Sequence, residues 1–117
     1  MNYEIVPVNE EMLDTLEEME KECFSVPWTR EMLQYQMSGN NVFLAAIHNG
    51  EVMGYIGMMF VLDEGYISNV AVTGKYRRQG IAKALIGALE EKCREMQLSF
   101  MTLEVRESNT PAIFPCG

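Results

Sequence analysis

The chain has 117 residues, a length that fits one domain over residues 1–117, and 48% of them are hydrophobic against 22% charged. This balance excludes disorder and low-complexity sequence. The formal net charge of -8 disfavours nucleic acid as a partner and favours a cationic one, such as a basic amine.

The sequence carries no signal for membranes, secretion or metal binding. Its apolar runs fall short of the roughly 20 residues of a transmembrane helix, and its N-terminus lacks the basic start of a signal peptide. Cys23, Cys93 and Cys116 have no CxxC spacing, and His48 is the one histidine. We therefore expect a cytoplasmic protein with free thiols, without metal and without a membrane partner.

Apolar periodicity predicts the elements of the first third. Alternation over residues 2–8 predicts a strand, and apolar residues three and four apart over 9–23 predict an amphipathic helix that Asn9 can cap. A break at Pro27 precedes a short second helix, which Thr29 can cap.

The middle of the chain has β character. Two apolar, β-rich runs over residues 41–65 flank Asn49-Gly50, the pair best suited to a type I′ hairpin turn. Gly54 and Gly57 fall inside the second run and can mark bulges. Residues 66–72 predict a further strand, antiparallel to the one before it.

A long amphipathic helix follows over residues 80–97, and residues 98–107 predict a last strand. Because a helix connects them, the strands at 66–72 and 98–107 should run parallel. The order β-α-α-β-β-β-α-β predicts a mixed sheet covered by helices, of the α/β or α+β class.

The loop before the long helix is basic and contains Gly74 and Gly80. The first N–H groups of a helix attract anions, and Gly80 lets backbone approach a ligand closely. Arg77 and Arg78 add donors for phosphate, so a pyrophosphate fits here. Spacing alone leaves a second interpretation open, in which Gly80 eases the turn and the arginines are solvated. The motifs of dinucleotide folds and P-loops are absent.

The stretch "SNVAVTGKYRRQGIAKALIGALEE" resembles the acetyl-CoA motif of the GNAT superfamily of N-acyltransferases, in which [RQ]-x-x-G-x-[GA] is matched by Arg77, Gly80 and Ala82. With "FSVPWTREM" upstream and "LEVRESNTPAI" downstream, the chain is similar to the RimI-type ribosomal-protein-alanine N-acetyltransferases from about residue 3 to Ile113. The resemblance implies a GNAT-like mixed, mostly antiparallel sheet flanked by helices, with acetyl-CoA as cosubstrate.

The resemblance also implies roles for individual residues. The CoA pyrophosphate would lie on the loop formed by Arg77, Arg78, Gln79, Gly80, Ile81 and Ala82. The pantetheine arm would lie along the backbone of Val70, Ala71 and Val72. Glu104 matches the general base, although a strand acid facing solvent or paired with Arg106 is the alternative. Asn109 matches a contact to CoA, and a turn is its alternative.

The end of the chain departs from the family pattern, in which a helix and two strands follow "SNTPAI". Here the sequence reads "FPCG", so we expect a truncated domain that lacks the last helix and strands. The tyrosine that serves as general acid falls at Cys116, and we assign no acid. The strand at 98–105 would then expose an unpaired edge, which favours a homodimer, and turnover should be weak or absent.

The implied acceptor is a basic protein N-terminus, by resemblance the N-terminal alanine of a ribosomal protein. A lysine side chain, a polyamine or a small amine are alternatives within the same chemistry. Two further alternatives are an inactive remnant that binds CoA or a partner, and a structural domain without a ligand.

Overall fold

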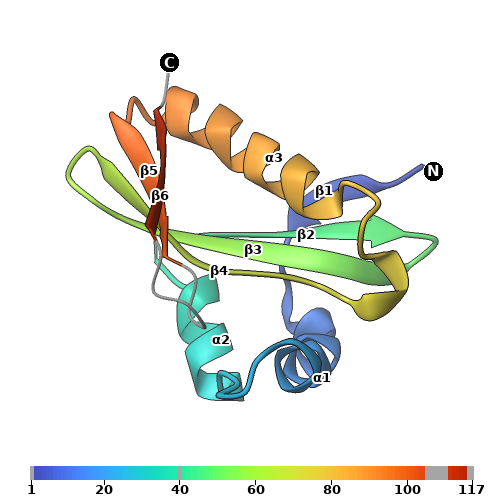
Figure 1. The fold of residues 1–117 in the computed structure, drawn as a ribbon. Coiled ribbons are helices and arrows are strands. Elements are labelled where there is room, and N and C mark those ends of the chain that lie inside the picture. Colours follow the sequence, from blue (N-terminus) through green and yellow to red (C-terminus); the bar gives the residue numbers. More distant parts are fainter. Residues whose placement is uncertain (1, 40, 105–110, 116–117) are drawn as a thin grey trace.

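The computed structural model describes residues 2–39, 41–104 and 111–115, with side chains up to residue 103. A six-stranded sheet, in the order β1-β2-β3-β4-β5-β6, lies between helices on both faces (Figure 1). The strands are β1 (Glu4–Pro7), β2 (Val42–His48), β3 (Glu51–Val61), β4 (Glu64–Val72), β5 (Phe100–Glu104) and β6 (Pro111–Pro115). The helices are α1 (Leu13–Cys23), α2 (Arg30–Met37) and α3 (Ile81–Glu95), with 3-10 turns η1 (Glu10–Met12) and η2 (Gly74–Tyr76).

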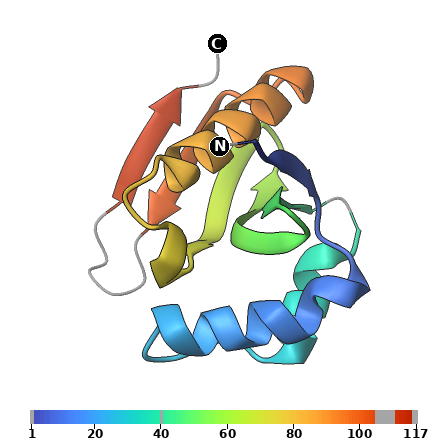
Figure 2. The same cartoon turned by 90° about the vertical axis from the view of Figure 1, so that its right-hand side faces the viewer.

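The helices form two layers. α3 packs on one face of the sheet, and α1 and α2 pack on the other, so that α1 and α3 lie on opposite sides (Figure 2). Figure 2 also shows β6 at the far side of the molecule from β1. Among the described residues, every helix is too short or too polar to cross a bilayer.

Each layer buries its own apolar cluster. The cluster under α3 is centred on Met53, Ile56, Leu85, Leu89 and Met101. The cluster under α1 and α2 is centred on Leu13, Leu16, Leu33, Phe43 and Tyr55. β2, β3 and β4 contribute to both clusters, because residues along each of these strands alternate between the two faces of the sheet.

The sheet follows the predicted topology. β4 and β5 run parallel, and every other neighbouring pair runs antiparallel. Asn49 and Gly50 have φ angles of 51° and 77°, as the predicted hairpin turn requires. Register shifts lie beside Gly54 and Gly57, which confirms the two predicted bulges.

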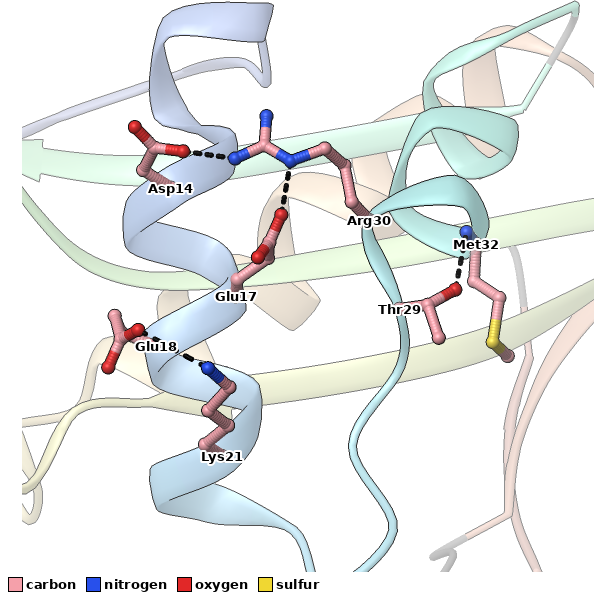
Figure 3. Close-up of polar contacts among 7 residues, drawn as sticks. All are labelled: Asp14, Glu17, Glu18, Lys21, Thr29, Arg30 and Met32. Atoms are coloured by element: carbon pink, nitrogen blue, oxygen red, sulfur yellow. Dashed lines mark hydrogen bonds and ion pairs between the residues drawn. The ribbon is translucent and has the colours of Figure 1, made fainter.

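The start of the first helix was predicted wrongly. Asn9 is extended and precedes only the 3-10 turn η1, without a side-chain hydrogen bond, and α1 begins at Leu13. The prediction at Thr29 is confirmed, since its Oγ1 accepts a hydrogen bond from Met32 N at 3.3 Å (Figure 3). A 3-10 turn and the first turn of an α-helix have the same apolar spacing over a few residues, so the sequence does not separate them.

The expected free edge at 98–105 is also wrong. β6 pairs antiparallel with β5 from Phe100↔Pro115 to Glu104↔Pro111, so β5 has a neighbour on each side. The sequence analysis predicted no element over residues 111–115 and expected the family's last helix and strands to be missing. Because β6 begins and ends with proline, which has no N–H to donate, this new edge strand offers fewer groups to another chain. The homodimer was expected because β5 would have an unpaired edge, and β6 now covers that edge.

One thiol also differs from the expectation. Cys93 of α3 is buried and disulfide-bonded, whereas Cys23 is a free, partly buried thiol. Spacing along the chain carries no information on which sulfur atoms the fold brings within bonding distance.

A buried carboxylate fixes the connection between α1 and α2. Glu20 has no exposed surface, and its two oxygens accept hydrogen bonds from Trp28 N (2.7 Å) and Tyr55 Oη (2.5 Å). At the surface, Arg30 pairs with Asp14 and Glu17 of α1 (Figure 3). The hydrogen bond from Arg30 to Asp14 raises the pKa of the guanidinium. These contacts set the position of α2 against the sheet.

Replacing either of two glycines by alanine should change the free energy of unfolding, in opposite directions at the two positions. A Cβ on Gly54 would lie 2.7 Å from the carbonyl oxygen of Ala71, so Gly54→Ala should lower the free energy of unfolding by about 2 kcal/mol. A Cβ on Gly87 in α3 meets nothing within 4 Å, so Gly87→Ala should raise it by about 0.5–1 kcal/mol. Urea denaturation of both variants tests this pair, and equal stability of the two would contradict it.

Candidate active site

β4 and β5 separate halfway along β4. Their parallel ladder ends at Ile67↔Leu103, and in the described part of the chain the rest of β4 pairs only with β3. Ser68 lies at this point as the extra residue of a bulge, because Gly57 pairs with Asn69 and Met58 with Ile67. The sequence analysis placed an extended ligand on Val70, Ala71 and Val72, which follow the bulge. Within the described ranges, their backbone therefore has one open edge, as an added strand would need.

The basic loop leads from that open edge to the start of α3. Arg78 and Gly80 both have positive φ angles, 62° and 80°. The first intrahelical bond shown at this end runs from Ala84 N to the Gly80 carbonyl at 3.0 Å. The N–H groups of Ile81, Ala82 and Lys83 precede that bond and have no partner inside the helix. N–H groups at the positive end of a helix dipole attract anions, and the anion site predicted here stays a prediction.

The backbone at Gly80 is unobstructed on the side where a side chain would project. A Cβ built on this residue meets nothing within 4 Å, so the helix start faces open space. Its φ of 80° is a conformation that glycine adopts at little cost. An extended ligand on β4 would thus reach, at the end of the strand, a turn able to hold its charged group.

The two arginines of the loop differ in their contacts. Arg77 Nε donates to the Val72 carbonyl oxygen (3.1 Å), and its NH2 group contacts Cys23 Sγ (3.4 Å) and Glu22 Oε2 (3.6 Å). Arg77 thus ties the loop to β4 and α1, a contact the sequence analysis did not foresee. Arg78 is exposed. Of the two predicted phosphate donors, only Arg78 is displayed to solvent without such ties.

Lys75 faces the β2–β3 turn. Its Nζ lies 3.3 Å from both carboxylate oxygens of Glu51 and 5.3 Å from the centre of the Tyr76 ring. The hydrogen bond to Glu51 raises the pKa of the Lys75 ammonium, which stays charged at neutral pH. Its charge is partly balanced at the surface, so Lys75 is a weaker candidate for phosphate than Arg78.

Glu22, which the sequence analysis missed, supports the loop from α1. Its Oε2 accepts a hydrogen bond from Gly74 N at 2.6 Å and pairs with Arg77. The acidic run around it in α1 hides this role, because Glu18 looks equivalent in the sequence. Glu18 forms an ion pair with Lys21, one turn away on the surface (Figure 3).

Removing the side chain of Glu22 should therefore lower the free energy of unfolding more than removing that of Glu18. Glu22→Ala leaves Gly74 N without its acceptor and should lower the free energy of unfolding by about 1 kcal/mol. Glu18→Ala removes a surface pair and should change it by less than about 0.5 kcal/mol. Thermal and urea unfolding of the two variants measure the difference, and an equal loss would argue against the support of the loop by Glu22.

Glu104 is the last residue of β5 and directly follows the last residue paired with β4. Its backbone thus lies where the two strands separate, near the end of the open edge. Its side chain is not described. Asn109 and Cys116, the other two predicted positions, lie outside the described residues. Within the ranges that are described, no three His, Cys, Asp or Glu side chains gather as metal ligands would.

A buried polar cluster lies beside the bulge and was also missed. It joins Gln36 of α2 with Ser68 and Asn69 of β4. The sequence did contain a signal for this cluster, because Gln36 follows Leu33 by one turn on the apolar face of α2. A polar side chain on a buried face needs buried hydrogen-bond partners.

The fold and the site together define a mixed α/β protein in which the strand edge at residues 70–72 leads to the glycine turn that begins α3. The sequence profile of the acetyltransferase (GNAT) family matches residues 11–114. The chain belongs to this family, which confirms the resemblance drawn from the loop motif and the predicted class of fold.

Two named relatives point to one branch of the family. A Bacillus subtilis protein, provisionally named a ribosomal protein bS18-alanine N-acetyltransferase, is 33% identical over 104 residues, 87% of this chain and 69% of the relative. The ribosomal protein bS18-alanine N-acetyltransferase of Haemophilus influenzae is 32% identical over 97 residues, 83% of this chain and 66% of the relative. The chain thus spans about two thirds of the length of these relatives.

Solved structures agree on the fold. The ribosomal-protein-S18-alanine N-acetyltransferase of Escherichia coli superposes with a TM-score of 0.83 at 25% identity, over 93% of this chain and 70% of its own. The PaiA N-acetyltransferase of Thermoplasma acidophilum, solved with coenzyme A, superposes with a TM-score of 0.83 at 19% identity, over 94% of this chain and 83% of its own. The second likeness concerns the fold alone.

Proposed function

We propose that residues 1–117 form one unit that binds acetyl-CoA and transfers its acetyl group to a protein N-terminal amine in the cytoplasm. The observation that carries the proposal is the opening of β4 after Ile67 onto the glycine turn at Gly80. Family membership supports the acetyl donor, and the named relatives support an N-terminal alanine as acceptor.

Each part of the donor has a counterpart in the site. The pantetheine amides pair with the open edge at Val70, Ala71 and Val72 as an added strand would. The pyrophosphate lies on the N–H groups that begin α3, with the exposed Arg78 as a charged donor. Gln79, Gly80, Ile81 and Ala82 supply the turn and Arg77 holds it to β4, while Asn109 is a further CoA contact by family resemblance.

The reaction needs no covalent intermediate on the protein. The amine nitrogen attacks the thioester carbonyl carbon, the new C–N bond forms, and the C–S bond breaks so that CoA leaves as a thiolate. A backbone N–H near Val70 stabilises the charge that develops on the carbonyl oxygen. The protein contributes mainly alignment of the two reactants and proton transfer.

Glu104 acts as the general base in this proposal. An α-amino group has a pKa of about 7.7–8.0, so much of it is protonated at neutral pH and must lose a proton before attack. The position of Glu104 at the end of β5, next to the separation of the strands, supports this role. The thiolate takes its proton from water, since no side chain is assigned as general acid.

The acceptor enters from the face that carries α1 and α2. An apolar cleft of about 330 Å³ lies there between α2 and β3, lined by Trp28, Met32, Tyr35 and Met59. The exposed carboxylate of Glu31 also lines it. This combination and the net charge of -8 suit a positively charged N-terminus that carries small or apolar side chains.

The test is a calorimetric titration with acetyl-CoA, followed by mass spectrometry of peptide acceptors. We expect binding, and acetylation of a peptide with a free N-terminal alanine but not of the same peptide with that amine blocked. Modification of lysine in the blocked peptide would instead assign a side-chain acceptor. Binding without any transfer would identify a CoA-binding protein that lacks turnover, and no binding by the folded protein would overturn the proposal.

A further inference from the structure

Gln36 of α2 is a buried glutamine whose amide hydrogen-bonds to three strands. Only 1% of its surface is exposed. Its Nε2 donates to the carbonyl oxygens of Val42 in β2 and Met58 in β3, both at 3.3 Å. Its Oε1 accepts from Ser68 Oγ in β4 at 2.9 Å. Both donors and the acceptor of the side chain are therefore used.

These contacts fix the orientation of the amide. Carbonyl oxygens only accept hydrogen bonds, so the nitrogen of Gln36 must face Val42 and Met58, and its oxygen must face Ser68. The hydroxyl of Ser68 consequently donates to Gln36. Burial strengthens this arrangement, because each of the three groups would lose a partner without water to replace it.

The three contacts surround the point where β4 leaves β5. Met58 and Ser68 lie at the shift in register between β3 and β4, and Val42 pairs with Met58. The last pair between β4 and β5, at Ile67, immediately precedes Ser68. Gln36 is thus hydrogen-bonded to Ser68, the bulge residue itself, which lies two positions before Val70.

Close packing around Asn69 shows that the bulge has little freedom. Asn69 is 3% exposed, and its Nδ2 has no hydrogen-bond partner among the described residues. A Cβ on Gly57 would lie 2.7 Å from Asn69 Oδ1 and 3.1 Å from Gln36 Cδ. An unpaired buried donor is unfavourable, so the conformation of this segment must be held by its neighbours, and Gln36 makes the bonds that do so.

We propose that Gln36 is a positioning residue that holds the Ser68 bulge, and through it the backbone N–H near Val70, in the geometry that polarises the thioester carbonyl. The inference rests on the proposed binding of acetyl-CoA. It also connects α2, which carries the acceptor cleft, to the strand that carries the donor. Gln36 itself lines that cleft.

The test compares Gln36→Leu, which keeps the volume and removes all three hydrogen bonds, with Gln34→Leu at an exposed position of the same helix. The readout is the infrared C=O stretch of bound [1-¹³C]acetyl-CoA, which moves to lower frequency when a donor polarises the carbonyl. In Gln36→Leu we expect this displacement to fall to about half or less, while the Kd for acetyl-CoA changes by less than about threefold. Gln34→Leu should match the wild type.

Three outcomes separate this inference from the proposed function. An unchanged carbonyl frequency in Gln36→Leu that binds acetyl-CoA would overturn the inference alone. Failure of the wild type to bind would overturn the proposed function and the inference with it. If Gln36→Leu does not fold, Ser68→Ala removes only the hydroxyl that joins the bulge to Gln36 and should give the same loss of displacement; an unchanged frequency there would overturn the inference.

Discussion

Gly80→Phe should weaken the binding of acetyl-CoA about 100-fold. A Cβ built on Gly80 meets nothing within 4 Å, so a large side chain there finds space and occupies the volume proposed for the pyrophosphate. Loss of two hydrogen bonds to a charged group corresponds to about 3 kcal/mol, or about two powers of ten in Kd. Calorimetric titration of the folded variant measures the change.

Gly50→Phe is the matched control for backbone strain. Gly50 has a φ of 77°, close to the 80° of Gly80, and a Cβ there also meets nothing within 4 Å. Both variants should lose stability by about 1–2 kcal/mol, because a side chain is disfavoured at positive φ. Only Gly80→Phe should lose affinity. Equal affinities in the two variants would mean that the start of α3 does not hold the ligand.

Glu104→Gln should lower kcat by about 100-fold or more, since general base catalysis commonly contributes that much. The amide keeps the shape of the side chain and cannot accept the proton of the amine. The Kd for acetyl-CoA should stay within about threefold of the wild-type value, because the residue acts on the acceptor. Initial rates with an alanine-starting peptide and a separate titration measure the two quantities.

Glu4→Gln is the control for charge. Glu4 is an exposed glutamate in β1, the edge strand farthest from β6, so its removal changes the net charge equally without touching the site. A kcat for Glu104→Gln close to that of Glu4→Gln would exclude Glu104 as the base. The proton would then have to pass to water or to another group.

Local sequence patterns predicted most of the secondary structure, because turns and helix caps depend on residues close together in the chain. Asn49-Gly50 forms the expected turn, and Thr29 caps α2. The errors occurred where a local pattern fits two structures. Asn9 precedes a 3-10 turn instead of the α-helix, and residues 111–115 form a strand that the sequence analysis did not predict.

The loop motif also gave the family, because binding a pyrophosphate at a helix start requires a glycine at a fixed position and few other residues fit. The match over residues 11–114 bears out that prediction. The contacts of the loop were beyond the reach of the sequence. The pairing of Arg77 with Glu22 and Val72, and of Lys75 with Glu51, depends on which side chains the fold brings together.

The sequence by itself thus determined the order of the strands and helices up to β5, the glycine turn at Gly80 and the membership of an acetyltransferase family, all of which are encoded by residues a few positions apart. Only the tertiary structure decided that β4 parts from β5 after Ile67 and that Gln36 is bonded to the bulge at that point. The hydrogen bonds of Gln36 join α2 to residues of β3 and β4 that are far away in the chain. Such bonds form only when packing removes water from between the partners, so no local sequence pattern predicts them.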